Sequence, residues 1–175
     1  MIDPRIHIID GDITQCRVDA IVNAANERLS DGSGVNGAIQ RAAGPQLLAE
    51  CRALGGCPTG QAVATKAYHL PAKFVFHAVG PVWRGGNADE VELLAGCYRA
   101  CFSLAQKHAI SSIAFPAIST GIYGFPPQRA AMIAARETKF YLDAGGALAR
   151  ILFVAFGEAA HAQLQHAFTE IFDAE

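Results

Sequence analysis

The sequence predicts an α/β fold in which helices cover both faces of a sheet. Short apolar runs rich in β-forming residues alternate along the chain with longer runs whose apolar residues recur at helical spacing. One short run, residues 18–22, is apolar at nearly every position, as expected of a strand buried on both faces. In such sheets a ligand binds beyond the carboxyl ends of the strands.

The first part of the chain is expected to contain two strands and two helices. Residues 6–10 form an apolar strand that leads into the polar turn 11–14. After the strand at 18–22, a glycine-rich turn leads into a helix over 38–43, which Gly44-Pro45 ends because proline cannot continue a helix. A second helix is expected over 46–54.

The middle of the chain is expected to add two strands and a long helix. Residues 62–67 and 74–79 are rich in β-forming residues, and the segment around Pro71 between them predicts a turn. Residues 90–108 place leucine and cysteine side chains at helical spacing, which predicts a helix.

The last part of the chain repeats the strand-helix alternation twice. Residues 112–116 predict a strand, and Pro126-Pro127 suits the first turn of a helix that continues over 128–142. Residues 151–156 predict the last strand, and 159–172 the last helix.

The composition indicates an ordered protein that we expect to form one domain over residues 1–175. Apolar residues make up 51% of the chain, and charged residues only 17%. A net charge of −2 without a Lys/Arg cluster excludes the electrostatic footprint of a nucleic-acid-binding protein. No apolar run approaches the roughly 18–20 residues of a membrane helix. We therefore expect neither nucleic acid nor a membrane as partner.

The cysteine content and the N-terminus bear on the compartment. Five cysteines are an odd number, which fits reduced thiols better than a disulfide framework. The N-terminal residues include an acid and a proline and lack the apolar core of a secretion signal. We therefore expect a cytoplasmic protein.

Two glycine-rich loops follow predicted strands and precede predicted helices. The first runs from Asn23 to Gly37, and the second from Ser119 to Gly124. A glycine loop that opens a helix exposes backbone N–H groups and the positive end of the helix dipole, and so binds anions. Two such loops facing one cleft would suit a diphosphate, and the asparagines of the first could hold hydroxyls or a water beside it.

The first loop also matches the dinucleotide fingerprint, as Gly32-x-Gly34-x-x-Gly37. We reject that interpretation. The fingerprint requires its first glycine directly after the strand and an acidic residue about 20 positions later. Here about seven residues separate the strand from the first glycine, and the region near Cys57 has no acid. A phosphate loop of the Gly-Lys-Ser/Thr type is absent from the sequence.

Three single residues at the expected ligand edge have alternative roles. Asp12 follows the first strand, where its carboxylate could accept a hydrogen bond from an exocyclic amine or could cap the turn at Thr14. Phe156 ends the last strand and could stack on a base, although an aromatic residue there is more often part of the core. Tyr123 lies between Gly121 and Gly124 and is expected to point outward.

The remaining reactive side chains predict no catalytic centre of their own. Cys97 and Cys101 share the apolar face of a predicted helix, which indicates core packing. His77 lies inside a predicted strand, where a buried hydrogen bond is expected rather than a metal. Cys57 has no obvious basic partner and is a weak candidate nucleophile. We expect no metal site and no cofactor.

Seven segments in order along the chain resemble the macrodomains, the ADP-ribose-binding fold. They span almost the whole sequence. The segments are Gly11-Asp-Ile-Thr14, Val18-Asp-Ala-Ile-Val-Asn-Ala-Ala-Asn26, Gly34-Val-Asn-Gly-Ala-Ile39, Arg41-Ala-Ala-Gly-Pro45, Gly56-Cys-Pro-Thr-Gly60, His77-Ala-Val-Gly-Pro81 and Ile118-Ser-Thr-Gly-Ile-Tyr-Gly124. Within the family the chain is most similar to the MacroD type, which hydrolyses ADP-ribosyl and O-acetyl-ADP-ribose esters. The resemblance implies a three-layer α/β/α sandwich with a mixed, mostly parallel sheet of about six strands.

The resemblance also implies ligand-binding roles for eleven residues. Asp12 would bind the adenine amine with a neighbouring backbone contact from Ile13, and Phe156 would stack on the adenine. Asn26 and Tyr123 would hold the distal ribose. The diphosphate would lie against two loops, which comprise Gly34, Val35, Ser119, Thr120, Gly121, Ile122 and Tyr123.

Asn36 departs from the family pattern, because MacroD-type hydrolases typically carry aspartate at this position, ten residues after Asn26. A carboxylate can take a proton from water, whereas a carboxamide can only orient the water. The preceding turn, Ser30-Asp-Gly-Ser-Gly34, also holds fewer glycines than is usual in the family. Asp31 could supply a displaced carboxylate, but its position in the turn is more simply that of a loop residue.

Three functions share the predicted pocket. The first is hydrolysis of ester-linked ADP-ribose, with Asn26 and Asn36 as the catalytic residues and a slow rate because Asn36 lacks a base. The second is a non-catalytic reader of ADP-ribose or ADP-ribosylated proteins, which Asn36 favours. The third is an ADP-ribose 1″-phosphate phosphatase. We favour the hydrolase, since positioning and electrostatics retain much catalysis without a base, and we expect a monomer.

Overall fold

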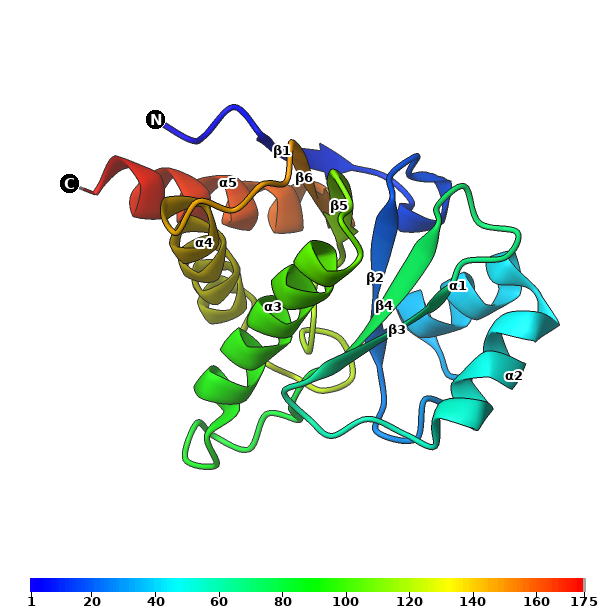
Figure 1. Cartoon of the computed structure of the whole chain (residues 1–175). Coiled ribbons are helices and arrows are strands. Elements are labelled where there is room, and N and C mark those ends of the chain that lie inside the picture. The colour runs from blue at the N-terminus through cyan, green and yellow to red at the C-terminus, as the bar shows by residue number, and fades with distance from the viewer. Residues whose placement is uncertain (175) are drawn as a thin grey trace.

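The computed structural model describes residues 1–174 as a six-stranded sheet between two layers of helices (Figure 1). The strands are β1 (Ile6–Asp10), β2 (Ala20–Ala25), β3 (Ala62–Lys66), β4 (Phe74–Val79), β5 (Ser112–Phe115) and β6 (Arg150–Ala155). The helices are α1 (Gly34–Ala43), α2 (Pro45–Leu54), α3 (Glu90–Lys107), α4 (Pro127–Asp143) and α5 (Glu158–Asp173), with a short 3-10 helix at Ile13–Gln15.

The sheet has the order β1-β6-β5-β2-β4-β3 and is parallel except for β3, which pairs antiparallel with β4. This arrangement confirms the predicted mixed, mostly parallel sheet. Because β1, β2, β4, β5 and β6 point the same way, the loops that follow them gather at one edge. Figure 1 shows α1 and α2 on one side of β2 and β4, and α3 on the other.

Two elements differ from the sequence predictions by more than one residue at a boundary. The strand predicted over 18–22 begins and ends later, at Ala20–Ala25, so that Asn23 lies inside it. A polar residue is tolerated there because its buried side chain is hydrogen-bonded. The helix predicted from residue 38 begins at Gly34, whose φ of 59° is in the left-handed region where glycine is favoured.

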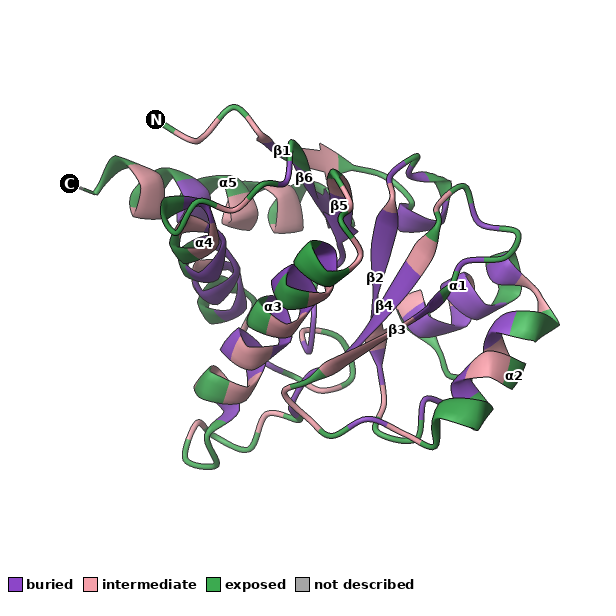
Figure 2. Ribbon diagram, viewed as in Figure 1, coloured by how far each residue is buried: buried purple, intermediate pink, exposed green. Residues whose placement is uncertain are grey.

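The core has two parts, one on each face of the sheet, and Figure 2 shows most of β2 and β4 buried. Successive residues of β2 point to opposite faces, so that Val22 packs under α3 and α4 while Ile21 packs under α1 and α2. Aromatic rings fill the first part: the rings of Phe115 and Phe153 are stacked with centroids 5.3 Å apart, and the edge of Phe102 meets Phe115.

The five cysteines are all buried and unbridged, and Cys97 and Cys101 lie in the core as predicted. Burial raises the pKa of the Cys97 thiol to about 12, which makes it a poor nucleophile. In the part of the chain that the structure describes, no helix has the length and apolarity required to cross a membrane.

The aromatic cluster predicts a matched pair of stability effects. We expect Phe115→Ala to lower the free energy of unfolding by about 3–5 kcal/mol, because it leaves a cavity among three rings from α3 and β6. Phe140→Ala should have little effect, because that ring lies on α4 and is 59% exposed. Denaturant unfolding of both variants measures the difference, and equal losses would contradict this account of the core.

Candidate functional site

A cavity of about 300 Å³ opens at the edge of the sheet where the parallel strands end. Its lining comes from the loops after β2, β4 and β5 and from the segment before β3. The residues are Asn26, Glu27, Arg28, Ser30, Thr59, Val79, Gly80, Val82 and Tyr123. The structure therefore brings together Asn26 and Tyr123, which were predicted to hold the same sugar although 97 positions separate them in the chain.

Ser30 is the residue on which the two predicted catalytic asparagines converge. The Asn26 Nδ2 donates to the Ser30 carbonyl at 3.2 Å, and the Asn36 Nδ2 donates to the same oxygen at 3.0 Å. The Asn26 Oδ1 accepts from the Ser30 N–H at 3.0 Å. The turn after β2 is thus held by two side-chain amides. Sequence reasoning missed Ser30, which carries no motif signal beyond its place four residues after Asn26.

Asn36 is only 7% exposed and lies in the first turn of α1. Besides its bond to Ser30, its Oδ1 accepts from the Asn23 Nδ2 at 2.9 Å. The Oδ1 and the Nδ2 of Asn36 therefore each already have a hydrogen-bond partner in the protein. A water bound to it can use only the remaining lone pair and the remaining hydrogen.

Two glycines of the first loop are required by packing. A Cβ on Gly32 would lie 2.8 Å from the Asn36 Nδ2, and a Cβ on Gly37 would collide with the Gly32 carbonyl. Gly34 faces open space at the start of α1. Ser33, its N-cap residue, makes no side-chain capping bond, so the first N–H groups of the helix remain available to an anion.

The second predicted anion loop follows β5 and is tightly wound. Ser119 has a φ of 66°, and its carbonyl accepts from the Phe125 N–H at 2.9 Å. Its buried hydroxyl has no hydrogen-bond partner among residues 1–174. This hydroxyl packs where a side chain on Gly80 would otherwise lie. Thr120, Gly121 and Ile122 follow at the surface, with the Ile122 side chain exposed.

The loop after β4 supports Tyr123. The Trp83 N–H donates to the Tyr123 carbonyl at 2.8 Å, which ties the two loops together. The next residues wrap around the Glu90 carboxylate, which accepts from the backbone N–H groups of Arg84, Gly86 and Ala88. These bonds lower the pKa of Glu90 to about 2, so the group is an anion that organises the loop.

The predicted adenine end of the site shows a mixed outcome. The Asp12 Oδ1 accepts from the Thr14 N–H at 2.9 Å and hydroxyl at 2.7 Å, so Asp12 caps the 3-10 helix. Its other oxygen makes no hydrogen bond within residues 1–174. Ile13 has a buried side chain and can offer only its backbone. Phe156 is 97% exposed, so the interpretation of this ring as core was wrong.

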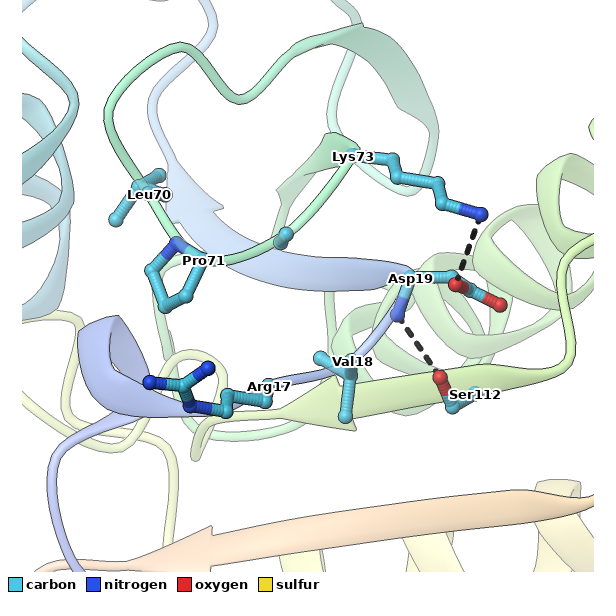
Figure 3. Close-up of a pocket in the computed structure, with 8 residues that line it drawn as sticks. Arg17, Val18, Asp19, Leu70, Pro71, Lys73 and Ser112 are labelled. Atoms are coloured by element: carbon cyan, nitrogen blue, oxygen red, sulfur yellow. Dashed lines mark hydrogen bonds and ion pairs between the residues drawn. The ribbon is translucent and has the colours of Figure 1, made fainter.

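A larger cavity, of about 430 Å³, lies at the opposite end of the strands (Figure 3). Asp19 dominates it: its carboxylate pairs with Lys73 at 3.4 Å and its N–H donates to the Ser112 hydroxyl at 2.8 Å. The Ser111 N–H, also bonded to that carboxylate, holds the pKa of Asp19 below its usual range. These contacts join the starts of β2, β4 and β5, which is a structural role. Ligands of parallel sheets bind at the other end.

Buried polar groups continue inward from Asn36. The Asn23 Nδ2 lies 3.2 Å from the His77 Nδ1, and the His77 Nε2 lies 2.9 Å from the Thr65 hydroxyl. His77 thus has the buried hydrogen bonds that its strand position predicts. Among residues 1–174, no group of three or more His, Cys, Asp or Glu side chains is placed to hold a metal ion.

The family model of the Macro domain matches residues 22–134 of this chain. The chain belongs to the macrodomain family. The matched range includes both glycine-rich loops and most of the cavity lining. It ends before β6, so Phe156 lies outside it, as does Asp12 at the other end of the chain.

Named relatives and solved structures resemble this macrodomain closely. An O-acetyl-ADP-ribose deacetylase from Salmonella gallinarum is 51% identical over 158 residues, 88% of each chain. A variant of the Oceanobacillus iheyensis macrodomain, solved with ADPR, has a TM-score of 0.91 and 38% identity, covering 95% of this chain and 92% of its own. The Trypanosoma brucei macrodomain, solved in complex with ADP-ribose, has a TM-score of 0.86 and 45% identity, covering 93% of this chain and 68% of its own.

Because His77 is buried, we expect the stability of this macrodomain to depend on pH. Burial lowers the pKa of its imidazole from 6.5 to about 4, so the unfolded chain binds this proton more readily than the folded one. Stability is therefore full above about pH 6.5 and falls as the pH drops. We expect His77 to remove about 2 kcal/mol from the free energy of unfolding between about pH 7 and pH 5.

Chemical denaturation of the wild type and of His77→Gln across that range measures this contribution. The variant should show a flatter dependence, because glutamine does not titrate. Equal slopes for the two proteins would contradict it. Asp3 and Glu90, whose pKa values hydrogen bonds lower to about 2, titrate below the range.

Proposed function

We propose that this macrodomain binds ADP-ribose and hydrolyses esters at its distal ribose, as in O-acetyl-ADP-ribose or mono-ADP-ribosylated acidic side chains. The observation that carries the proposal is the cavity that Asn26 and Tyr123 share, next to the uncapped start of α1. Further support comes from relatives named O-acetyl-ADP-ribose deacetylase and from related macrodomains solved with ADP-ribose.

The arrangement of the three subsites supports a ligand lying along the carboxyl edge of the sheet. The exposed ring of Phe156 offers a flat apolar surface for an adenine, and Asp12 has a free carboxylate oxygen for its amine. The N–H groups at Gly34 and Val35 and the loop from Ser119 to Tyr123 would hold the diphosphate. The cavity would then receive the distal ribose and its ester.

In the proposed reaction, a water attacks the ester carbonyl carbon, the bond from that carbon to the ribose oxygen breaks, and the ribose oxygen receives a proton. The Asn26 Nδ2, which uses one of its hydrogens on Ser30, has another to orient the water or the carbonyl. Asn36 supplies no base, so a phosphate oxygen of the substrate takes the water's proton. Loss of a general base costs about 10²–10⁴ in rate, so we expect slower turnover than in macrodomains with aspartate there.

A non-catalytic reader is the second candidate function. The observation that favours it is Asn36, whose amide is buried and bonded on both sides and cannot accept a proton at neutral pH. A reader would use the same cavity to hold ADP-ribose on a modified protein. Turnover alone separates the two functions, and an ADP-ribose 1″-phosphate substrate in the same assay covers the phosphatase.

We also propose that the protein is a monomer in a reducing compartment, the cytoplasm. Support for the compartment comes from its five buried cysteines, none of which forms a disulfide. ADP-ribosylated proteins are the proposed macromolecular substrates. The side chains of Val82, in the cavity lining, and Ile122, in the loop before Tyr123, are exposed and can contact the protein that carries the modification.

The binding half of the proposal predicts an effect of Phe156. We expect Phe156→Ala to weaken ADP-ribose binding about tenfold, since stacking on a base is worth about 1–3 kcal/mol. Its 97% exposure means that the fold should not suffer. Phe140→Ala, which removes an exposed ring from α4, is the matched control and should bind normally. Calorimetric titration with ADP-ribose measures the affinity of all three proteins. If the wild type gave no heat at millimolar ADP-ribose, the proposed binding would be excluded.

The catalytic half predicts an effect of Asn26. We expect the wild type to release acetate from O-acetyl-ADP-ribose above the buffer rate, and Asn26→Ala to lose about 10²-fold or more of that rate. Mass spectrometry follows the products from this ester and from a glutamate-ADP-ribosylated protein. Tight ADP-ribose binding with no turnover of either substrate by the wild type would select the reader.

A further inference from the structure

The Ser30 carbonyl fixes which way the Asn36 amide faces. A carbonyl oxygen only accepts, so the Asn36 group 3.0 Å from it must be the Nδ2 donor. The Oδ1 of Asn36 then faces Asn23 and requires a donor, which is the Asn23 Nδ2 at 2.9 Å. One external contact thus determines the orientation of two buried amides.

Matching donors to acceptors in the same way determines the tautomer of His77. The second hydrogen of the Asn23 Nδ2 points to the His77 Nδ1 at 3.2 Å, which must therefore be the unprotonated nitrogen. The proton is then on Nε2, which donates to the Thr65 hydroxyl at 2.9 Å. The Thr65 hydroxyl in turn donates to the Lys66 carbonyl at 3.0 Å. The donors of Asn23, His77 and Thr65 therefore each have an acceptor, while the Asn23 Oδ1 has no partner among residues 1–174.

The sheet holds this path in place. Asn23 and His77 are register partners in the parallel pair β2 and β4, and Thr65 lies on β3, which pairs antiparallel with β4. All three side chains are at most 2% exposed. The strands therefore position the three groups, and α1 brings only Asn36 to them.

We propose that Asn23, His77 and Thr65 are positioning residues: they hold the Asn36 amide so that it fastens the Ser30 turn at the edge of the ligand cavity. The inference rests on the proposed function only for its consequence in binding. The relay itself, defined as Asn36, Asn23, His77 and Thr65, exists in the ligand-free protein. In this relay, residue 36 must be an amide because it accepts one hydrogen bond and donates another.

A carboxylate at position 36 would break the hydrogen bond that Asn36 donates to the Ser30 carbonyl. It could still accept from Asn23, but its second oxygen would face the Ser30 carbonyl at about the 3.0 Å that now separates donor and acceptor. Two acceptors at that distance repel each other. The asparagine that distinguishes this chain from the typical MacroD pattern is therefore matched to its own turn, and aspartate does not simply restore a missing base.

The first experiment tests the relay without ligand. Nitrogen-15 NMR of the histidine rings should show His77 as the neutral Nε2–H tautomer. Thr65→Val removes the hydroxyl that accepts that proton, so we expect the Nε2–H signal of His77 to shift and hydrogen exchange at residues 30–34 to rise about tenfold or more, while the tautomer is kept because Asn23 still donates to Nδ1. Thr65→Ser keeps the hydroxyl and should restore both. An Nδ1–H tautomer in the wild type would overturn the inference.

Thr138→Val is the matched control, because the Thr138 hydroxyl is also buried and donates to a backbone carbonyl, that of Ala134 in α4. It should lose stability without changing exchange at residues 30–34. If both valine variants alter exchange there equally, the effect is general destabilisation, and the positioning role is wrong. If Thr65→Val does not fold, Thr65→Ser and the wild-type tautomer still decide.

The second experiment tests the need for an amide. We expect Asn36→Asp to raise exchange at residues 30–34 and to weaken ADP-ribose binding about tenfold, while the His77 tautomer is kept because Asn23 still has an acceptor. Unchanged exchange with unchanged affinity would overturn the inference. Failure of the wild type to bind ADP-ribose would instead exclude the proposed function, since exchange and tautomer are measured without ligand.

Discussion

The parallel pairing of β2 with β4 on one side and β5 on the other underlies the rest of this structure. It places β2 in the middle of the sheet, and it sets the loops that follow three neighbouring strands around one opening. The same pairing aligns Asn23 with His77. Burying an amide and an imidazole in a sheet is unfavourable unless both are hydrogen-bonded. Their mutual bond, extended to Asn36 and Thr65, satisfies the imidazole and the Nδ2 of Asn23 and connects the core to the site, while the Asn23 Oδ1 has no partner among residues 1–174.

The two ends of the sheet carry different chemistry. At the amino ends, Asp19 accepts from serine and pairs with lysine, and these charged contacts bind the strand starts together. At the carboxyl ends, the candidate site combines amide side chains, backbone N–H groups and close-packed glycines, with Glu27 and Arg28 as the charged residues of the cavity lining. Such a site can bind an anion through oriented dipoles without a cluster of basic residues. This agrees with a chain whose net charge is −2.

Much of the site was accessible to sequence reasoning because its signals are local. Glycine next to asparagine after an apolar run predicts an exposed turn, and the positions of Asn26 and Tyr123 follow from the rule that ligands bind beyond strand ends. Ser30, Thr59 and Val82 were missed, because a residue that lines a cavity only through the approach of another loop leaves no local pattern. The start of α1 was also placed late, since Gly34 has low helix propensity but suits a left-handed first residue.

The sequence by itself determined the alternation of strands and helices and the position of the two glycine-rich loops, because these depend on periodicity and on glycine, and seven of its segments carried the resemblance to macrodomains. Only the tertiary structure decided that Phe156 is exposed, that Asp12 caps a turn, and that Asn36 is bonded to Ser30 and Asn23. The physical reason is that a hydrogen bond needs a partner at about 3 Å. Ser30 and Asn23 lie six and thirteen positions before Asn36, in a turn and on a strand, and no local pattern names them as its partners.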